Sequence, residues 1–188
     1  MFNKKKEYID KIKKEYEIVK DEEGRSLIEI KVDNKDSVLS SFSTKEAIIS
    51  NELAEFINHQ LRPMTLTNGI HLNLICDDIT DEEKKIYDSA IRNYYKHELI
   101  EKNRELTRNK VLVWVMGILG TIILAVSILL NVLERLTVFA SVIDIVAWVL
   151  LWEAVDLHIF QRPKIEIEEL RAYEIANSII TYNEIKVD

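Results

Sequence analysis

Residues 111–130 read VLVWVMGILGTIILAVSILL, and this stretch decides the architecture of the chain. It is 20 residues long and carries no charged side chain. An α-helix needs roughly 20 predominantly apolar residues to cross a bilayer, whereas a helix in the core of a soluble protein normally keeps a polar face. We therefore predict a transmembrane helix over these residues.

A second apolar stretch follows almost at once. Residues 136–152 read LTVFASVIDIVAWVLLW and contain a single acid, Asp144. Because only residues 131–135 separate the two stretches, two spanning helices joined there would form an antiparallel hairpin. The predicted domains are a cytoplasmic α+β sensing domain (1–105), a transmembrane hairpin (106–160, with spans 111–130 and 136–152) and a cytoplasmic C-terminal segment (161–188).

Basic residues flank the predicted hairpin at its open end. The connector between the spans has a single basic residue, Arg135. Cytoplasmic flanks of transmembrane helices carry an excess of lysine and arginine, so we expect both termini in the cytoplasm. The flanking residues are Lys96, Lys102, Arg104, Arg108 and Lys110 before the first span, and Arg162, Lys164 and Arg171 after the second.

Small residues recur every four positions in the first span, at Gly117, Thr121 and Ala125. Small side chains let two membrane helices approach closely. We expect this stripe to form the contact between the two arms of the hairpin.

Asp144 is the most informative residue of the second span. It shares one helical face with Thr137 and Ser141, and a carboxylate at that depth costs about 2.5–3.5 kcal/mol. The first span offers no basic partner. Two interpretations remain: Asp144, Ser141 and Thr137 line or gate a water-filled path, or protonated Asp144 bonds a neighbouring helix. Both predict a homo-oligomer, since two helices alone cannot enclose a water path.

Alternating apolar residues predict the strands of the cytoplasmic domain. Residues 26–32 and 70–76 each alternate with a period of two, which is typical of a half-buried strand. Residues 179–187 are expected to form a short strand that returns to the N-terminal sheet. The expected architecture is therefore an α+β domain attached to an oligomeric, helical membrane part.

Capping signals and a proline predict where helices begin and end. One helix is expected within residues 44–61, with a candidate capping box at residues 43–46. A stronger box, Thr80 to Glu83, opens a long helix that should run directly into the first span. Pro163 should break or redirect the helix that leaves the second span.

Catalytic motifs are missing from the sequence. It has no glycine-rich phosphate loop, HExxH, GxSxG or CxxC, so we expect no enzyme, no cofactor and no metal site. Cys76 and His71 are interpreted as a core residue and a surface residue. The acidic cluster at residues 77–83 is interpreted as a solvated helix start; only a divalent metal bound there would favour a membrane-bound enzyme.

Basic residues interleave with aromatic ones in two segments, a pattern that favours a nucleotide or single-stranded nucleic-acid ligand. The alternatives are a solvated helix face or attraction to anionic lipid, and the net charge of -7 argues against bulk nucleic-acid binding. The candidate ligand-binding residues are Lys4, Lys5, Lys6, Lys13 and Lys14, and then Arg92, Tyr94, Tyr95 and Lys96.

Two parts of the sequence resemble small bacterial two-transmembrane proteins with an N-terminal cytoplasmic α+β domain. They are Ser40–Ser43 with Ile49-Ser50 and Glu52–Ile57, and Trp148 with Trp152–Asp156, Arg162 and Tyr173. The architecture is similar to membrane effectors of anti-phage defence, and most similar to the channel subunits of the Hailong system. That resemblance implies a tetrameric inner-membrane ion channel controlled by single-stranded DNA made by a partner nucleotidyltransferase.

The function expected from the sequence is a ligand-regulated, homo-oligomeric membrane channel or pore-forming effector. The alternative is a non-conducting membrane anchor or scaffold that recruits a cytoplasmic partner. The two differ in whether the protein conducts ions.

Overall fold

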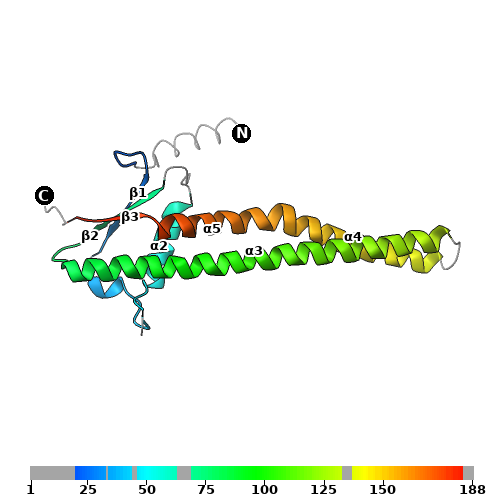
Figure 1. Ribbon diagram of the computed structural model, residues 1–188, viewed down its shortest axis with the longest axis horizontal. Helices are drawn as coiled ribbons and strands as arrows, with labels where there is room; N and C mark the ends of the chain where they lie inside the picture. The colour runs from blue at the N-terminus through cyan, green and yellow to red at the C-terminus, as the bar shows by residue number, and fades with distance from the viewer. Residues whose placement is uncertain (1–19, 33, 44–45, 63–68, 133–136, 184–188) are drawn as a thin grey trace, which may run out of the picture. The chain divides into compact units, whose positions relative to one another are not determined.

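The computed structural model of the chain describes residues 20–32, 34–43, 46–62, 69–132 and 137–183. Figure 1 shows the elements in chain order. The chain divides into two compact units, one of residues 1–96 with 171–188 and one of residues 97–170. The C-terminal segment predicted at 161–188 therefore divides between the units, because its last part joins the N-terminal residues.

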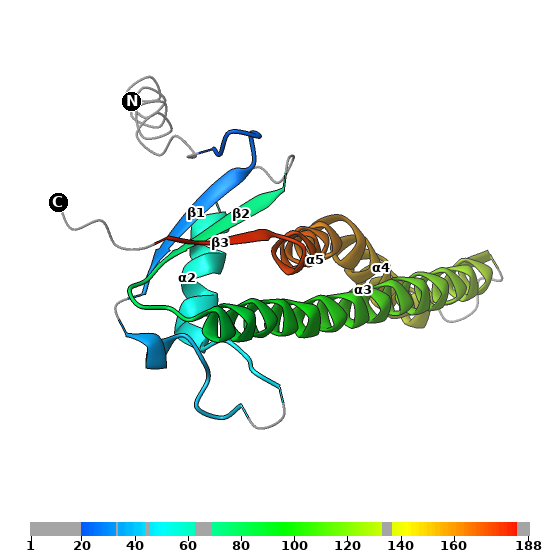
Figure 2. The ribbon, with the colours of Figure 1, turned by 60° about the vertical axis from the view of Figure 1, so that its left-hand side comes forward.

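A small parallel sheet forms one layer of the first unit. It consists of β1 (Ser26–Lys31), β2 (Ile70–Ile75) and β3 (Ile179–Asn183), with β2 in the middle, as Figure 2 shows. The two strands predicted by alternation are confirmed, and so is the return of the C-terminal segment to the N-terminal sheet, which β3 makes with residues 179–183. The rest of that expected strand, residues 184–187, lies outside the described residues. The fold is mostly helical with this one three-stranded sheet, in agreement with the coarse α+β prediction.

The core of the first unit lies between the sheet and two helices, α2 (Asn51–Leu61) and the first turns of α3 (Asp81–Val132). Tyr95 of α3 is fully buried, and its hydroxyl donates to the carbonyl oxygen of Ala54 at 3.3 Å. This contact joins the two helices. The core side chains are Ile28, Ile30, Ile70, Leu72 and Leu74 of the strands, Ala54, Ile57 and Leu61 of α2, and Ala90, Ile91 and Tyr95 of α3.

Helix α2 begins later than the first capping signal suggests. Its N-cap is Ser50, whose side chain accepts from the amide of Leu53 at 3.3 Å. The capping box expected at residues 43–46 is wrong. Leu39 and Ile49 form an antiparallel bridge, and Ser40 donates its amide to Ile48. This pairing holds the backbone before Ser50 in an extended form that no helix can share.

The capping box that opens α3 is confirmed. The Glu83 amide donates to Thr80 Oγ1 at 3.3 Å, and the Glu83 carboxylate accepts from the Thr80 amide at 2.7 Å. Lys35, in the short helix η1 (Lys35–Ser37), approaches the same carboxylate at 3.2 Å. From this start α3 continues without a break for 52 residues into the apolar stretch, as predicted.

Helix α4 (Thr137–Asp156) is followed by a π-helical turn, η2 (Leu157–Gln161), and then by α5 (Arg162–Ala176). Of the break or redirection expected at Pro163, the break is absent, because helical turns continue on both sides of this residue. The regular α-helix does give way to the π turn just before it. A proline clashes with the carbonyl four residues before it, which here belongs to Ile159 inside the π turn. The wider turn accommodates the ring, which explains why the expected break is absent.

Helices α3 and α4 pack antiparallel within the second unit. A Cβ added at Gly120 would lie 2.9 Å from Leu151, so the helices contact closely there. Ala140 and Ala147 of α4 are fully buried and seven residues apart, which is also the spacing between Gly120 and the buried Ser127 of α3. Side chains seven residues apart stay on one seam of a helix pair.

The small-residue stripe predicted for this contact does not form it. A Cβ at Gly117 would meet nothing within 4 Å, and Thr121 and Ala125 are exposed. Residues four apart drift around a helix of 3.6 residues per turn. A stripe of that spacing therefore leaves the seam that Gly120 and Ser127 follow.

Candidate functional site

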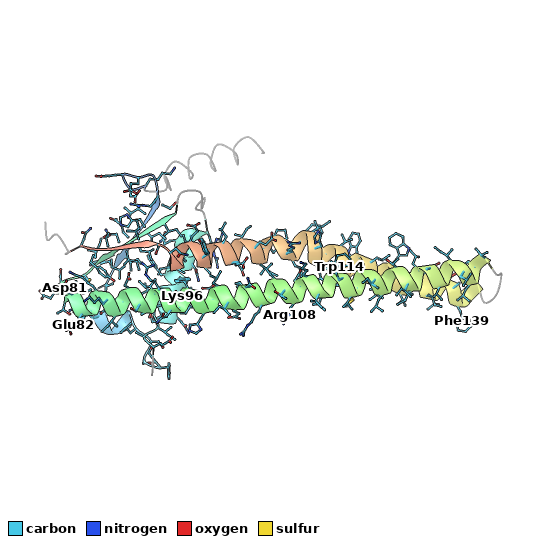
Figure 3. The ribbon with its side chains drawn as sticks, in the orientation of Figure 1. Asp81, Glu82, Lys96, Arg108, Trp114 and Phe139 are labelled. Atoms are coloured by element: carbon cyan, nitrogen blue, oxygen red, sulfur yellow. The ribbon has the colours of Figure 1, made fainter. Side chains whose placement is uncertain are left out.

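The apolar part of α3 is a candidate membrane span. Among the described residues it is the one helix long and apolar enough to cross a bilayer, and only 11% of its most apolar window is buried. Figure 3 marks the change along the helix, where the charged residues up to Arg108 precede Trp114. A soluble protein rarely exposes so large an apolar surface, and this exposure argues against a core helix of a single soluble chain.

Helix α4 is not among the helices long and apolar enough to count as a candidate membrane span. Its 20 residues include the three acids Asp144, Glu153 and Asp156. On length and composition, the described part of the chain therefore contains one candidate span and not the two-helix hairpin that the sequence predicts. The side chains of α4 are nevertheless largely apolar and exposed: Phe139, Val142, Ile145, Val146, Trp148, Val149, Trp152 and Val155.

Asp144 lies near the middle of α4 and is half-buried. Within the described residues no hydrogen bond or ion pair reaches its carboxylate. Ser141, one turn earlier, is exposed, and Thr137 begins the helix with a side chain outside the described part. The helical spacing of positions 137, 141 and 144 is the basis for the predicted shared face, and that prediction stays untested because the side chain of Thr137 is outside the described part.

The first set of candidate ligand-binding residues lies outside the described residues; it consists of Lys4, Lys5, Lys6, Lys13 and Lys14. In the second set, Arg92 binds within its own unit. Its guanidinium donates to the carbonyl oxygens of Ala176 at 2.8 Å and Ser178 at 3.1 Å, and it pairs with Asp88. Arg92 thus caps the C-terminal end of α5 and holds the entry to β3.

The other residues of that set do not share one exposed surface. Tyr95 is a core residue, and Tyr94 meets it edge to face with the ring centroids 5.1 Å apart. Lys96 is exposed. The buried ring of Tyr95 offers no face on which a base can stack.

A polar network on the sheet is the feature that the sequence interpretation missed. His71 is expected at the surface, but its ring lies between two partners: Nδ1 is 3.0 Å from Asp21 Oδ2, and Nε2 is 2.8 Å from Thr181 Oγ1. Thr181 also donates to Asn73 Oδ1 at 3.2 Å. The network joins the turn before β1 to β2 and β3.

Asp21 is the charged end of this network. Burial disfavours its ionised form, but hydrogen bonds from the side chain and amide of Arg25, from His71 and from the Glu23 amide outweigh burial and lower the pKa of Asp21 to about 2. One pattern in the sequence could have indicated this network: the positions of β2 and β3 that face away from the core are polar, as at His71, Asn73 and Thr181. Asn73 and Thr181 are register partners in the ladder.

A second charged cluster lies where α3 and α5 meet in the second unit. Lys102 pairs with Glu168 at 2.6 Å, and Asn103 donates to Glu169 at 3.2 Å. One carboxylate oxygen of Glu98 is buried and has no hydrogen-bond partner among the residues that the structure describes. Burial raises the pKa of Glu98, against the opposing charge of Lys102, and the charge of Glu168 raises it further.

Cys76 is buried, and burial raises the pKa of its thiol, which fits the predicted core role. Across the described ranges, no group of three His, Cys, Asp or Glu side chains is placed to hold a metal ion. The acidic residues at the start of α3 include Glu83, which closes the capping box.

Comparison with protein-family models, with curated proteins and with solved structures finds no match to this chain.

Proposed function

We propose that this chain is the subunit of a homo-oligomeric membrane channel in which α3 and α4 form a two-helix transmembrane hairpin. Asp144, Ser141 and Thr137 would then line or gate the ion path. The first unit would be the cytoplasmic part that senses a ligand.

The pairing of β2 with β3 is the observation that supports the hairpin. Residues 70–75 precede α3 and residues 179–183 follow α5, yet the two strands share one ladder of backbone hydrogen bonds. Both strands must therefore lie on the same side of any membrane, and the chain between them crosses it an even number of times. If the apolar part of α3 crosses once, α4 is the segment available for the return.

Asp144 carries the channel proposal. A half-buried carboxylate without a partner in the described part of the chain is unstable against lipid. Assembly of several subunits around a polar axis would bring it into contact with water. Carboxylates in an ion path favour cations over anions, so the proposed channel is cation-selective.

The flanking charge supports an orientation with both termini in the cytoplasm of a bacterial cell. Trp114, Trp148 and Trp152 are all about two-thirds exposed, and each would lie toward the cytoplasmic boundary of its helix. Indole rings prefer the interface between headgroups and acyl chains. The proposed location is the inner membrane.

Ligand control by a nucleotide or single-stranded DNA remains part of the proposal, in line with the resemblance to defence effectors and a partner nucleotidyltransferase. Because Arg92 and Tyr95 serve the fold, the candidate contacts that remain are Tyr94 and Lys96, together with Lys4, Lys5, Lys6, Lys13 and Lys14. Phe42, which is 90% exposed in the first unit, favours the alternative of a non-conducting anchor that docks a cytoplasmic partner.

A measurement of ion flux distinguishes the channel from the non-conducting anchor. The full chain is reconstituted in liposomes, with and without single-stranded DNA oligonucleotides, and compared with Asp144→Asn, Asp144→Leu and the neighbouring control Ile145→Leu. The channel proposal expects flux from the wild type and from Ile145→Leu, and a strong loss in Asp144→Leu. Absence of flux under every condition, from protein confirmed in the bilayer, would favour the anchor.

A further inference from the structure

An apolar groove of about 580 Å³ runs between α3 and α4 with η2. Its wall on α3 includes Trp114, Gly117 and Thr121, and its wall on the other side includes Leu151 and His158. The remaining lining side chains are aliphatic. The volume is within the range of pockets that hold small ligands, roughly 300–1,000 Å³.

Gly117 keeps this groove open. A Cβ there would meet nothing within 4 Å, whereas a Cβ at Gly120, one turn further, would collide with Leu151. The hydroxyl of Thr121 donates to the Gly117 carbonyl at 2.8 Å, so it is already bonded to its own helix. The floor of the groove therefore offers apolar contact and suits an apolar chain.

Two side chains that can donate to an anion lie toward the end of the groove nearer the charged part of α3, His158 in its lining and Lys110 beyond it. His158 is exposed and has no bonding partner in the described residues. Lys110 lies one turn before Trp114, is exposed and likewise has no ion-pair partner there. Side chains on a helix tilt toward its N-terminus, so Lys110 extends beyond the apolar wall. No acidic residue lines the groove.

We infer that this groove binds one anionic phospholipid, with an acyl chain along Gly117 and the phosphate at Lys110 and His158. An imidazole N–H donates to a phosphate oxygen whether or not the ring is charged, and a lysine attracts anionic lipid at the cytoplasmic surface. The inference rests on the proposed membrane insertion of α3 and α4. It adds a lipid site at the boundary between the apolar and charged parts of the second unit.

The test uses the full chain in detergent and native mass spectrometry, with phosphatidylglycerol or phosphatidylcholine added. Gly117→Leu places a side chain in open space and fills the groove. Ala125→Leu is the matched control, because Ala125 is exposed on the same helix and does not line the groove. We expect one phosphatidylglycerol per wild-type chain, about tenfold weaker retention in Gly117→Leu, and no change in Ala125→Leu.

A double variant tests the proposed contacts of Lys110 and His158 with the lipid headgroup. Lys110→Gln with His158→Gln should remove the preference for phosphatidylglycerol over phosphatidylcholine. Equal retention in wild type and Gly117→Leu would overturn the inference. It would also be overturned if Gly117→Leu changed the number of chains per particle and left lipid per chain unchanged, since a second copy would then occupy the groove. Failure of the protein to enter membrane fractions would instead contradict the proposed function.

Discussion

Ser127 of α3 donates a hydrogen bond from its Oγ to the carbonyl oxygen of Ala140 of α4 at 2.9 Å, and both residues are fully buried. The bond lies near the connector between the two helices and fixes their antiparallel register. A hydroxyl paired across a helix interface in this way suits an apolar surrounding, where an unpaired polar group is costly. The contact therefore gives the proposed hairpin a specific seam.

Substitution of Ser127 tests that seam. Ser127→Leu forces a large side chain between two helices in close contact and should destabilise the chain by about 1–3 kcal/mol. Ile128→Leu, at an exposed neighbouring position, is the control. Thermal unfolding of the full chain in detergent, followed by circular dichroism, should show a lower midpoint for Ser127→Leu alone. Equal midpoints for the two variants would mean that the helices do not pack along this seam.

The network around His71 predicts an acid-dependent loss of stability. The pKa of Asp21 is lowered from 3.8 to about 2 in the folded chain. A carboxyl whose pKa is depressed by folding stabilises the fold above its unfolded pKa, and this stabilisation is lost as the pH falls through the folded value. The contribution of Asp21 should therefore be complete above pH 3.8 and should disappear toward pH 2.

Asp21→Asn removes that contribution at every pH. The difference in unfolding midpoint between wild type and Asp21→Asn should be largest above pH 3.8 and should shrink toward pH 2. Glu22→Gln, at an exposed position beside it, controls for the general effect of one charge. A difference that stays constant between pH 2 and pH 5 would show that the ionised carboxylate of Asp21 does not hold the network.

The charge of Glu98 should affect stability in the opposite direction to that of Asp21. Burial raises its pKa above 4.5, so its ionised form destabilises the fold at neutral pH, and this penalty is lost as the pH falls through the folded value. Glu98→Gln should raise the free energy of unfolding at pH 7, because the neutral amide has no charge to bury. The exposed acid Glu55, replaced by Gln, is the control. Chemical denaturation of the full chain measures both, and a loss of stability in Glu98→Gln would contradict the stated cause.

Local sequence patterns were sufficient to predict the strands, the start of α3 and its continuation into the apolar stretch. Each of these depends on residues close together in the chain, such as the reciprocal bonds of Thr80 and Glu83. Local patterns could not predict that Ser50 is the N-cap of α2. It depends on the bridge between Leu39 and Ile49, which is a tertiary contact.

The polar network was missed for the same physical reason. The partners of His71 are 50 and 110 residues away in the chain, so no local pattern around His71 identifies them. The contact face of α3 was misassigned because small residues occur at spacings of four and of seven on the same helix. Only the position of α4 distinguishes Gly120 and Ser127 from Gly117.

If cations pass Asp144 in an oligomeric pore, the pore is cation-selective, and the reversal potential across a planar bilayer with a KCl gradient measures that selectivity. We expect the wild-type reversal potential to lie toward the K⁺ equilibrium potential and Asp144→Asn to move it toward zero. Current through both proteins with the same reversal potential would contradict this expectation, because the ion path would then not pass this carboxylate.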